Sequence, residues 1–217
     1  MEKVYFDDTT FIWKSKLNLV EDKPILLKEA YSVIESQPDT KTDGFGYRKV
    51  WNNNINFIGD ITIQNSIDKV MQLGINYCKE LYKESNKPYN KINTDIWVNM
   101  VRSKDPVQIQ FKHDEIKGVD KYHTHTDINK EMGSFFPNYT YVYYIQMPDV
   151  MEEEEGVLYF RGQNKQEYWI RPEEDDLIIM EGWMPHAPNN APKSTIDRIV
   201  IAGNVGFEMI KKEKSLL

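Results

Sequence analysis

The spacing of the apolar residues changes once along this chain, at about residue 94, and this change constrains the fold more than any other feature. Before it, two segments have apolar residues at the three- and four-residue spacing of helices. After it, short apolar or alternating runs are separated by turns rich in Pro and Gly. Because no helical pattern alternates with the later runs, a parallel α/β fold is disfavoured.

Two helices are predicted, over residues 23–37 and 66–83. The first has one apolar stripe, made of Leu27, Ala30, Tyr31 and Ile34. The second has an apolar face made of Ile67, Val70, Met71, Cys78 and Leu81. Asp22 and Ser66 are the expected N-caps, since short polar side chains accept hydrogen bonds from the first free N–H groups. The segment 38–60 between the helices is rich in turn formers and is predicted to be a loop.

Seven strand candidates follow the helices, each bounded by turn signals: 95–102, 107–113, 139–147, 156–161, 167–171, 177–181 and 196–205. Short strands at this spacing indicate a β-sandwich or a jelly roll, with the two helices covering one sheet from outside. We expect a single domain over residues 1–217. In it, 1–94 is a helical N-terminal support, 95–206 is the core and 207–217 is a C-terminal tail.

Composition excludes several functional classes. Apolar residues make up 40% of the 217, enough for a packed core, and the net charge of −7 disfavours a nucleic-acid-binding surface. Cys78 is the single cysteine, so neither an intramolecular disulfide nor a cysteine-rich zinc site is expected. The first 20 residues do not resemble a signal peptide, and no run of 18 apolar residues predicts a membrane span. These features predict a soluble cytoplasmic protein.

The histidines are few, and two of them stand near a carboxylate. The chain contains His113, His123, His125 and His186. His125 and Asp127 are two residues apart, so on an extended segment their side chains point to the same side. His186 follows the candidate strand 177–181. Two imidazoles and one carboxylate leave three octahedral positions open, which is the donor set of non-haem Fe(II) oxygenases.

Arg198 is the charged residue that makes this pattern more specific. It stands 12 residues after His186 in a strand otherwise made of Ile, Val and Ala. If Arg198 faces the interior of a barrel, burial of its charge costs free energy unless an anion pairs with it. A dicarboxylate would pair with its planar guanidinium. Facing outward beside Asp197, it would be an ordinary surface residue.

These segments together resemble the Fe(II)/2-oxoglutarate-dependent oxygenase superfamily. The resemblance is carried by HTD at 125–127, TYVYYI at 140–145 and DLIIMEGWMPHAPNNAPKSTIDRIVIAGNV at 176–205. The nearest pattern is that of the prolyl-hydroxylase-like branch and of small oxygenases common in phage and marine genomes. The likeness covers about residues 95–206. A phage origin would place the protein in the host cytoplasm.

The resemblance implies a mainly β fold, the double-stranded β-helix (jelly roll), with N-terminal helices packed on one sheet. It implies that His125, Asp127 and His186 bind iron and that Arg198 pairs with the distal carboxylate of 2-oxoglutarate. Tyr144 would donate its hydroxyl to the same carboxylate, and Thr140, on the same strand face, is a further candidate for binding 2-oxoglutarate. The segment EEEEGVLYF (152–160) departs from the family, because many members have Gly-Gly before this strand.

The implied activity is hydroxylation of a small molecule or peptide, with peptidyl or free amino acids such as proline favoured. Fe(II) and 2-oxoglutarate are the implied cofactors, with ascorbate as a further candidate. O₂ is the co-substrate, and succinate and CO₂ are released. Neither a membrane nor a nucleic acid is an expected partner.

The remaining polar and aromatic candidates have simpler interpretations. The acidic runs Glu152–Glu155 and Glu173–Asp176 are expected to be solvated turns, and His113 is expected at the surface. Support for the metal ligands could come from three asparagines, Asn189, Asn190 and Asn204. Trp51 and Trp183 are candidates for a substrate cleft or for packing.

Two alternatives stay open from the sequence. A cupin would bind metal through three histidines and a glutamate, His123, His125, His186 and Glu131, although the gap before Glu131 is one residue longer than usual. In a cupin Arg198 has no role. The second alternative is a jelly-roll binding or structural module without catalysis, for example part of a virus particle.

Overall fold

The computed structural model describes residues 1–36, 41–42, 46–57, 63–101, 122–125, 137–149, 152–189, 191 and 193–209. In this part of the chain the helical elements are η1 (Val20–Asp22), α1 (Lys23–Glu35) and α2 (Ser66–Lys83). The strands before α2 are β1 (Glu2–Tyr5), β2 (Phe11–Lys16), β3 (Lys41–Thr42) and β4 (Gly46–Phe57). The strands after α2 are β5 (Tyr89–Val101), β6 (Tyr139–Gln146), β7 (Leu158–Arg161), β8 (Glu167–Ile170), β9 (Asp176–Glu181), β10 (His186–Pro188) and β11 (Arg198–Met209).

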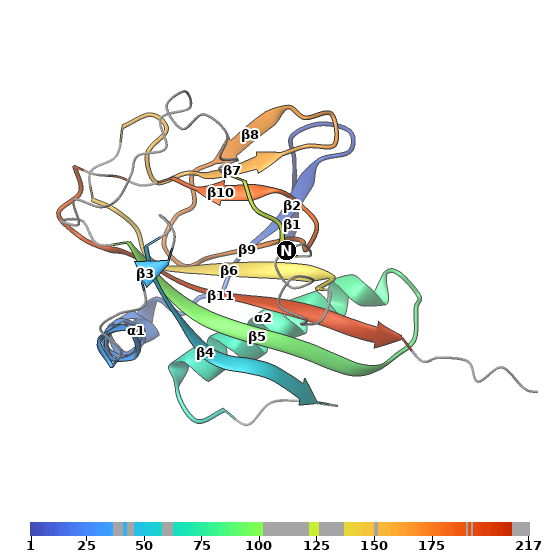
Figure 1. Cartoon of the computed structure of the whole chain (residues 1–217), viewed down its shortest axis with the longest axis horizontal. Helices are drawn as coiled ribbons and strands as arrows, with labels where there is room; N and C mark the ends of the chain where they lie inside the picture. Colours follow the sequence, from blue (N-terminus) through green and yellow to red (C-terminus); the bar gives the residue numbers. More distant parts are fainter. Residues whose placement is uncertain are drawn as a thin grey trace, which may run out of the picture.

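The strands form two antiparallel sheets. The large sheet has the order β1-β2-β9-β6-β11-β5-β4-β3, and the small sheet has the order β10-β7-β8. Figure 1 shows α1 and α2 on one side of the large sheet and the small sheet on its other side. Two facing sheets with helices outside one of them confirm the predicted jelly roll and the position of the helices. No helix of the described residues is long and apolar enough to cross a membrane.

The side chains of strand β6 pack on both faces of the large sheet, against the helices on one side and the small sheet on the other. Tyr141, Tyr143 and Ile145 pack into the cluster that contains the buried residues of both helices. Val142 and Tyr144 point the other way, into the cluster shared with Leu158 and Phe160 of the small sheet, because successive side chains of a strand alternate between faces. The face of β6 toward the small sheet is therefore the interior of the jelly roll.

The helices lie where the sequence predicts them, but their caps differ. Asn65, rather than Ser66, caps α2: its side-chain oxygen accepts a hydrogen bond from the Asp68 N–H at 2.9 Å. Asp22 makes no side-chain capping bond to α1, because it lies in helical conformation at the end of η1. The predicted apolar face of α2 is confirmed as buried, with a close approach of the helix to the sheet at Gly74, where a Cβ would lie 2.9 Å from the Tyr141 ring.

In α1, the buried stripe is shifted by one residue from the prediction. The buried residues are Leu26, Ala30, Val33 and Ile34, whereas Leu27 and Tyr31 are only partly buried and pack against the same core. The stripe therefore lies slightly to one side of the predicted one.

Six of the seven predicted strands are confirmed, and 107–113 lies outside the described residues. The loop predicted for 38–60 is wrong, because Gly46–Phe57 forms β4 and pairs with β5. The N-terminal part is also more than a helical support, since β1 and β2 extend the large sheet through pairing of β2 with β9. Strand β11 continues to Met209, into the segment predicted as a tail.

The acidic run Glu173–Asp176 is not the solvated turn that the sequence predicts. Asp176 is fully buried and forms ion pairs with Lys14 at 3.0 Å and with Lys16 at 2.9 Å. Asp175 is buried too, and its carboxylate accepts hydrogen bonds from the N–H groups of Asn18 and Leu19 and from the Tyr143 hydroxyl. These two carboxylates tie the N-terminal segment to the large sheet. Glu155 of the other run is also buried.

Candidate metal centre

Three histidines meet on the inner side of the small sheet. His123 and His186 form an isolated antiparallel bridge, so the segment 122–125 extends the small sheet beyond β10. His186 lies opposite Phe160 of β7, and Phe160 packs into the cluster between the two sheets. One ligand nitrogen from each of His123, His125 and His186 lies within 4.8 Å of the others. The pairing of strands therefore brings together residues that are far apart in the sequence.

The two predicted histidine ligands have a geometry that suits one ion. The Nε2 atoms of His125 and His186 are 3.2 Å apart, and both side chains are buried. Two imidazole nitrogens bound at about 2.1 Å in neighbouring octahedral positions would be about 3.0 Å apart. The observed distance therefore fits two donors to the same cation.

His186 is held in the form that binds metal. Its Nδ1 lies 2.9 Å from the Met184 carbonyl oxygen, which can only accept, so Nδ1 carries the proton and Nε2 presents its lone pair. Burial lowers the pKa of His186 to about 4, against the opposing effect of the Met184 hydrogen bond. The ring is therefore neutral at pH 7.

His125 is positioned by a backbone contact and by a stacked ring. Its N–H donates to the Gly182 carbonyl oxygen at 3.1 Å, and its ring stacks on Trp97 of β5 at a centroid distance of 5.4 Å. A Cβ at residue 182 would lie 2.4 Å from the Pro137 carbonyl oxygen, so only glycine fits there. Gly182 and Trp97 are not among the site residues that the sequence predicts. The glycine between β9 and His186 is the signal that could have indicated a close backbone approach.

Some predicted ligands lie outside the described residues. Asp127, the proposed third iron ligand, is one of them, as are Glu131 of the cupin alternative and His113. Asn190 also lies outside them, and nothing is described of the Trp51 side chain. Trp183 is 38% exposed, and its indole N–H donates to the Glu181 carboxylate.

Arg198 faces the interior, as the jelly-roll interpretation predicts. The residue is only 4% exposed, and its Nη1 donates to the Asn189 carbonyl oxygen at 3.1 Å, just beyond the end of β10. Its Nε is buried without a hydrogen-bond partner, and no acidic side chain of the described residues forms an ion pair with it. Burial lowers the pKa of this guanidinium from its ordinary value. A buried cation with an unused N–H is a group that an anionic ligand would satisfy.

Tyr144 and Thr140 lie on the same face of β6 but at different distances from Arg198. Tyr144 is opposite Val200, two residues from Arg198, and the arginine charge opposes the rise that burial causes in the pKa of Tyr144. Thr140 is opposite Asn204, six residues and about 20 Å along β11 from Arg198. Its hydroxyl donates to the Asn204 side-chain oxygen at 2.8 Å. Tyr144 can therefore share a carboxylate with Arg198, and Thr140 cannot.

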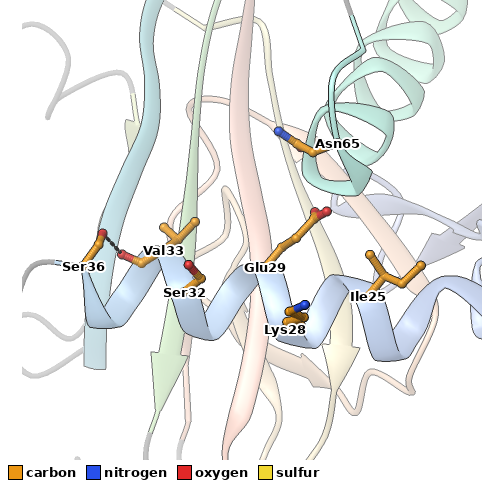
Figure 2. Close-up of a pocket in the computed structure, with 7 residues that line it drawn as sticks. All are labelled: Ile25, Lys28, Glu29, Ser32, Val33, Ser36 and Asn65. Carbon is orange, nitrogen blue, oxygen red and sulfur yellow. Dashed lines mark hydrogen bonds between the residues drawn. The ribbon is translucent and has the colours of Figure 1, made fainter.

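A separate hollow of about 390 Å³ lies in the helical layer, on the other face of the large sheet. Figure 2 shows Glu29 of α1 directed toward Asn65 at the start of α2. The Glu29 carboxylate accepts hydrogen bonds from the N–H groups of Ser66 and Ile67 at 3.3 and 3.1 Å, so it satisfies the first turn of α2. The polar groups of this hollow thus serve helix packing, and the histidine cluster is the candidate site.

Comparison with known proteins supports the fold assignment. No protein-family model matches the sequence, and no curated protein matches it either. Among solved structures, a Pseudomonas putida prolyl-4-hydroxylase is 10% identical with a TM-score of 0.55, over 92% of each chain. The chain therefore shares the fold of this prolyl-4-hydroxylase. IDO from Bacillus thuringiensis is also 10% identical, with a TM-score of 0.52 over 90% of each chain.

A third solved structure has a lower TM-score. It is an oxidoreductase of the 2OG-Fe(II) oxygenase family from Burkholderia pseudomallei, 9% identical with a TM-score of 0.45, covering 86% of this chain and 82% of that chain. At identities this low, the first two structures show a shared jelly-roll fold.

Proposed function

We propose that this chain is an Fe(II)- and 2-oxoglutarate-dependent dioxygenase that hydroxylates an amino acid, free or within a peptide. One observation carries the proposal. Two buried imidazoles with Nε2 atoms 3.2 Å apart share the interior of the jelly roll with a buried arginine whose Nε is unsatisfied. A metal-binding pair and an anion-binding group that both face the interior match a ferrous ion and a dicarboxylate.

The described residues fit this cofactor pair. His125 and His186 would hold the iron through Nε2, with Asp127 as the third ligand that the HxD pattern predicts. Arg198 would bind the distal carboxylate, and Tyr144 would donate its hydroxyl to the same group. Asn189 stands three residues after His186, about 10 Å along the chain, and its carbonyl oxygen holds the guanidinium. The arginine side chain and a five-carbon keto-diacid can together cover that span.

The residues around the pair control the geometry and exclude water. Gly182 and Trp97 hold His125 in place, and the Met184 carbonyl oxygen orients His186. Val142, Ile178 and Met180 line the interior with apolar surface, which strengthens the attraction between Arg198 and an anion. With O₂, the bound iron and 2-oxoglutarate supply oxidation of a substrate C–H bond and release succinate and CO₂.

The preference for an amino-acid substrate rests on the prolyl-hydroxylase-like sequence pattern and on the shared fold with the Pseudomonas putida prolyl-4-hydroxylase. A net charge of −7 disfavours a nucleic acid. Ascorbate would serve as an auxiliary reductant. A cytoplasmic location, in the host if the source is a phage, agrees with the reducing conditions that Fe(II) needs.

The test is anaerobic addition of Fe(II) and 2-oxoglutarate to the full chain. Chelation of iron by the keto acid should produce a weak visible charge-transfer band. The band should vanish in His186→Ala and weaken strongly in Arg198→Ala. Arg171→Ala is the matched control, because Arg171 is exposed and, among the described residues, donates to the carbonyl oxygens of Glu152 and Glu153, away from the histidines. A wild-type chain without this band would refute the proposal.

The cupin alternative is favoured by one observation, the position of His123 within the histidine cluster. It gives no role to the buried Arg198, whereas the oxygenase does. Alanine at Asp127 separates the two: it should abolish metal-dependent turnover in an oxygenase and have a mild effect in a cupin.

A further inference from the structure

His123 is a histidine that the proposed function does not use, although it lies beside both proposed ligands. Its backbone exchanges two hydrogen bonds with His186, each with an N···O distance of 3.1 Å. Antiparallel residues paired in this way lie directly opposite each other, with their side chains on the same face. The main chain therefore fixes His123 on the side of the sheet where His186 points.

The three rings are close enough to serve one ion after a small movement. The His123 ring centroid is 4.3 Å from that of His186 and 5.2 Å from that of His125. The three ligand nitrogens lie within 4.8 Å of one another. Nitrogen donors bound at about 2.1 Å to a tetrahedral zinc ion lie about 3.4 Å apart, close to the 3.2 Å between the Nε2 atoms of His125 and His186. For the His123 nitrogen to join the same ion it has to move inward by at most about 1.4 Å, which rotation of its side chain can supply.

We propose that His123, His125 and His186 form a three-imidazole site for Zn²⁺ and similar cations, which does not need the Asp127 carboxylate. Three imidazoles with an open fourth position are a donor set that zinc adopts in proteins. First-row affinities place Zn²⁺ and Co²⁺ above Fe²⁺ at nitrogen donors. Replacing a carboxylate with a third imidazole thus moves the preference of the site toward zinc.

This site would regulate the activity if the proposed function is correct. His125 and His186 belong to both donor sets, so a cation held by the three imidazoles excludes iron from the same place. His123 is then a residue that determines metal specificity: it gives zinc a binding mode that competes with ferrous loading. The chain would be inactive with zinc bound and would recover when zinc is removed.

The test uses Co²⁺ as a spectroscopic substitute for zinc, added to full-length protein from which metals have been stripped. In Asp127→Ala the three histidines remain, so the Co²⁺ affinity and the visible d–d absorption should persist. In the double variant Asp127→Ala/His123→Gln the affinity should fall by about tenfold or more, because even loss of a group that only supports a ligand costs about 10–100-fold. Equal affinities in the single and double variants would overturn the proposal.

A second measurement counts the ligands directly. Ring N–H protons of histidines bound to Co²⁺ give paramagnetically shifted proton NMR signals. The Asp127→Ala protein should show signals from three ligand histidines, and signals from only two would refute the site even if the double variant failed to fold. Thermal unfolding of each metal-free variant checks the fold. The Fe(II)–2-oxoglutarate band of the wild-type chain is recorded separately, so failure of the oxygenase assignment is distinguishable from failure of the zinc site.

Discussion

Replacing Arg198 with methionine should separate ligand binding from stability. Arg198 is 4% exposed, its guanidinium donates to the Asn189 carbonyl oxygen, and its Nε has no hydrogen-bond partner. Methionine has a similar length and no charge. Removing the arginine therefore loses one hydrogen bond, about 1 kcal/mol, and relieves the burial of a charge. The free energy of unfolding of the protein without 2-oxoglutarate should fall by no more than about 2 kcal/mol, or rise.

The loss of affinity for 2-oxoglutarate should be much larger. A bidentate pair with a carboxylate makes two charge-assisted hydrogen bonds, each contributing about 1.5–3 kcal/mol. Loss of about 3–5 kcal/mol raises Kd about a hundredfold to several thousandfold. At a ligand concentration of about 100 times the wild-type Kd, 2-oxoglutarate stabilises the wild-type protein by about 2.7 kcal/mol. For a chain of this size, the corresponding rise in Tm is about 5–10 °C.

The assay is thermal unfolding with Mn²⁺, which occupies similar donors without turnover, with and without 2-oxoglutarate. The Arg198→Met protein should show a ligand-dependent shift below about 2 °C, and the Arg171→Met control should keep the full shift. The reasoning fails if Arg198→Met keeps the ligand shift and loses about 3–5 kcal/mol of stability without ligand. That result would mean that Arg198 belongs to a buried ion pair within the protein.

Substitutions at Tyr144, Gly182 and Asp175 test the interior face, the support of His125 and the attachment of the N-terminal segment. Tyr144→Phe should raise the Kd for 2-oxoglutarate about two- to tenfold, because one hydrogen bond is lost. Tyr143 lies on the opposite face of β6, so Tyr143→Phe should leave this Kd unchanged. Isothermal titration calorimetry measures both values. Gly182→Ala should weaken Mn²⁺ binding about tenfold or more, because a clash with the Pro137 carbonyl oxygen would displace the Gly182 carbonyl oxygen that accepts the His125 N–H. An unchanged affinity in a metal titration would contradict this prediction. Asp175→Ala should lower the free energy of unfolding by about 2–5 kcal/mol in urea, since three hydrogen-bond donors lose their acceptor.

The helices and core strands could be predicted because their signals are local. Helix α2 begins and ends at the predicted residues, since its apolar face repeats over five turns. Strand β6 has apolar or aromatic residues on both faces, so its sequence is one continuous apolar run. Such a run predicts a buried strand without knowledge of the strands that pair with it. The sequence left two orientations of Arg198 open, and the structure shows that it faces the interior with 4% of its surface exposed.

Strands β1, β2 and β4 could not be predicted because long-range pairing determines them. Strand β4 contains three successive asparagines, which are poor strand formers, and its pairing with β5 is irregular around Asn52. The register with β5 imposes the extended conformation there. Strand β2 is short, and its partner β9 lies more than 150 residues later. The burial of Asp176 has the same cause, because its lysine partners belong to β2.

The sequence could indicate which residues belong to the candidate site, but not how their side chains are oriented or how far apart they lie. The HxD spacing indicates that His125 faces one side, yet the orientation of His123 depends on its bridge to His186. Likewise, only the register of β6 against β11 shows that Thr140 is remote from Arg198 while Tyr144 is near. Spacing along one strand cannot reveal which end of the neighbouring strand a residue meets.

The pairing of His125 with His186 also has a mechanical consequence. The two residues are 61 positions apart in the sequence, so a metal ion coordinated by both rings would link two distant parts of the chain. For comparison, a covalent crosslink that closes a loop of this length lowers the entropy of the unfolded chain and so stabilises the fold by about 4 kcal/mol. Metal bound through both rings should therefore raise the free energy of unfolding, and removal of the metal should lower it.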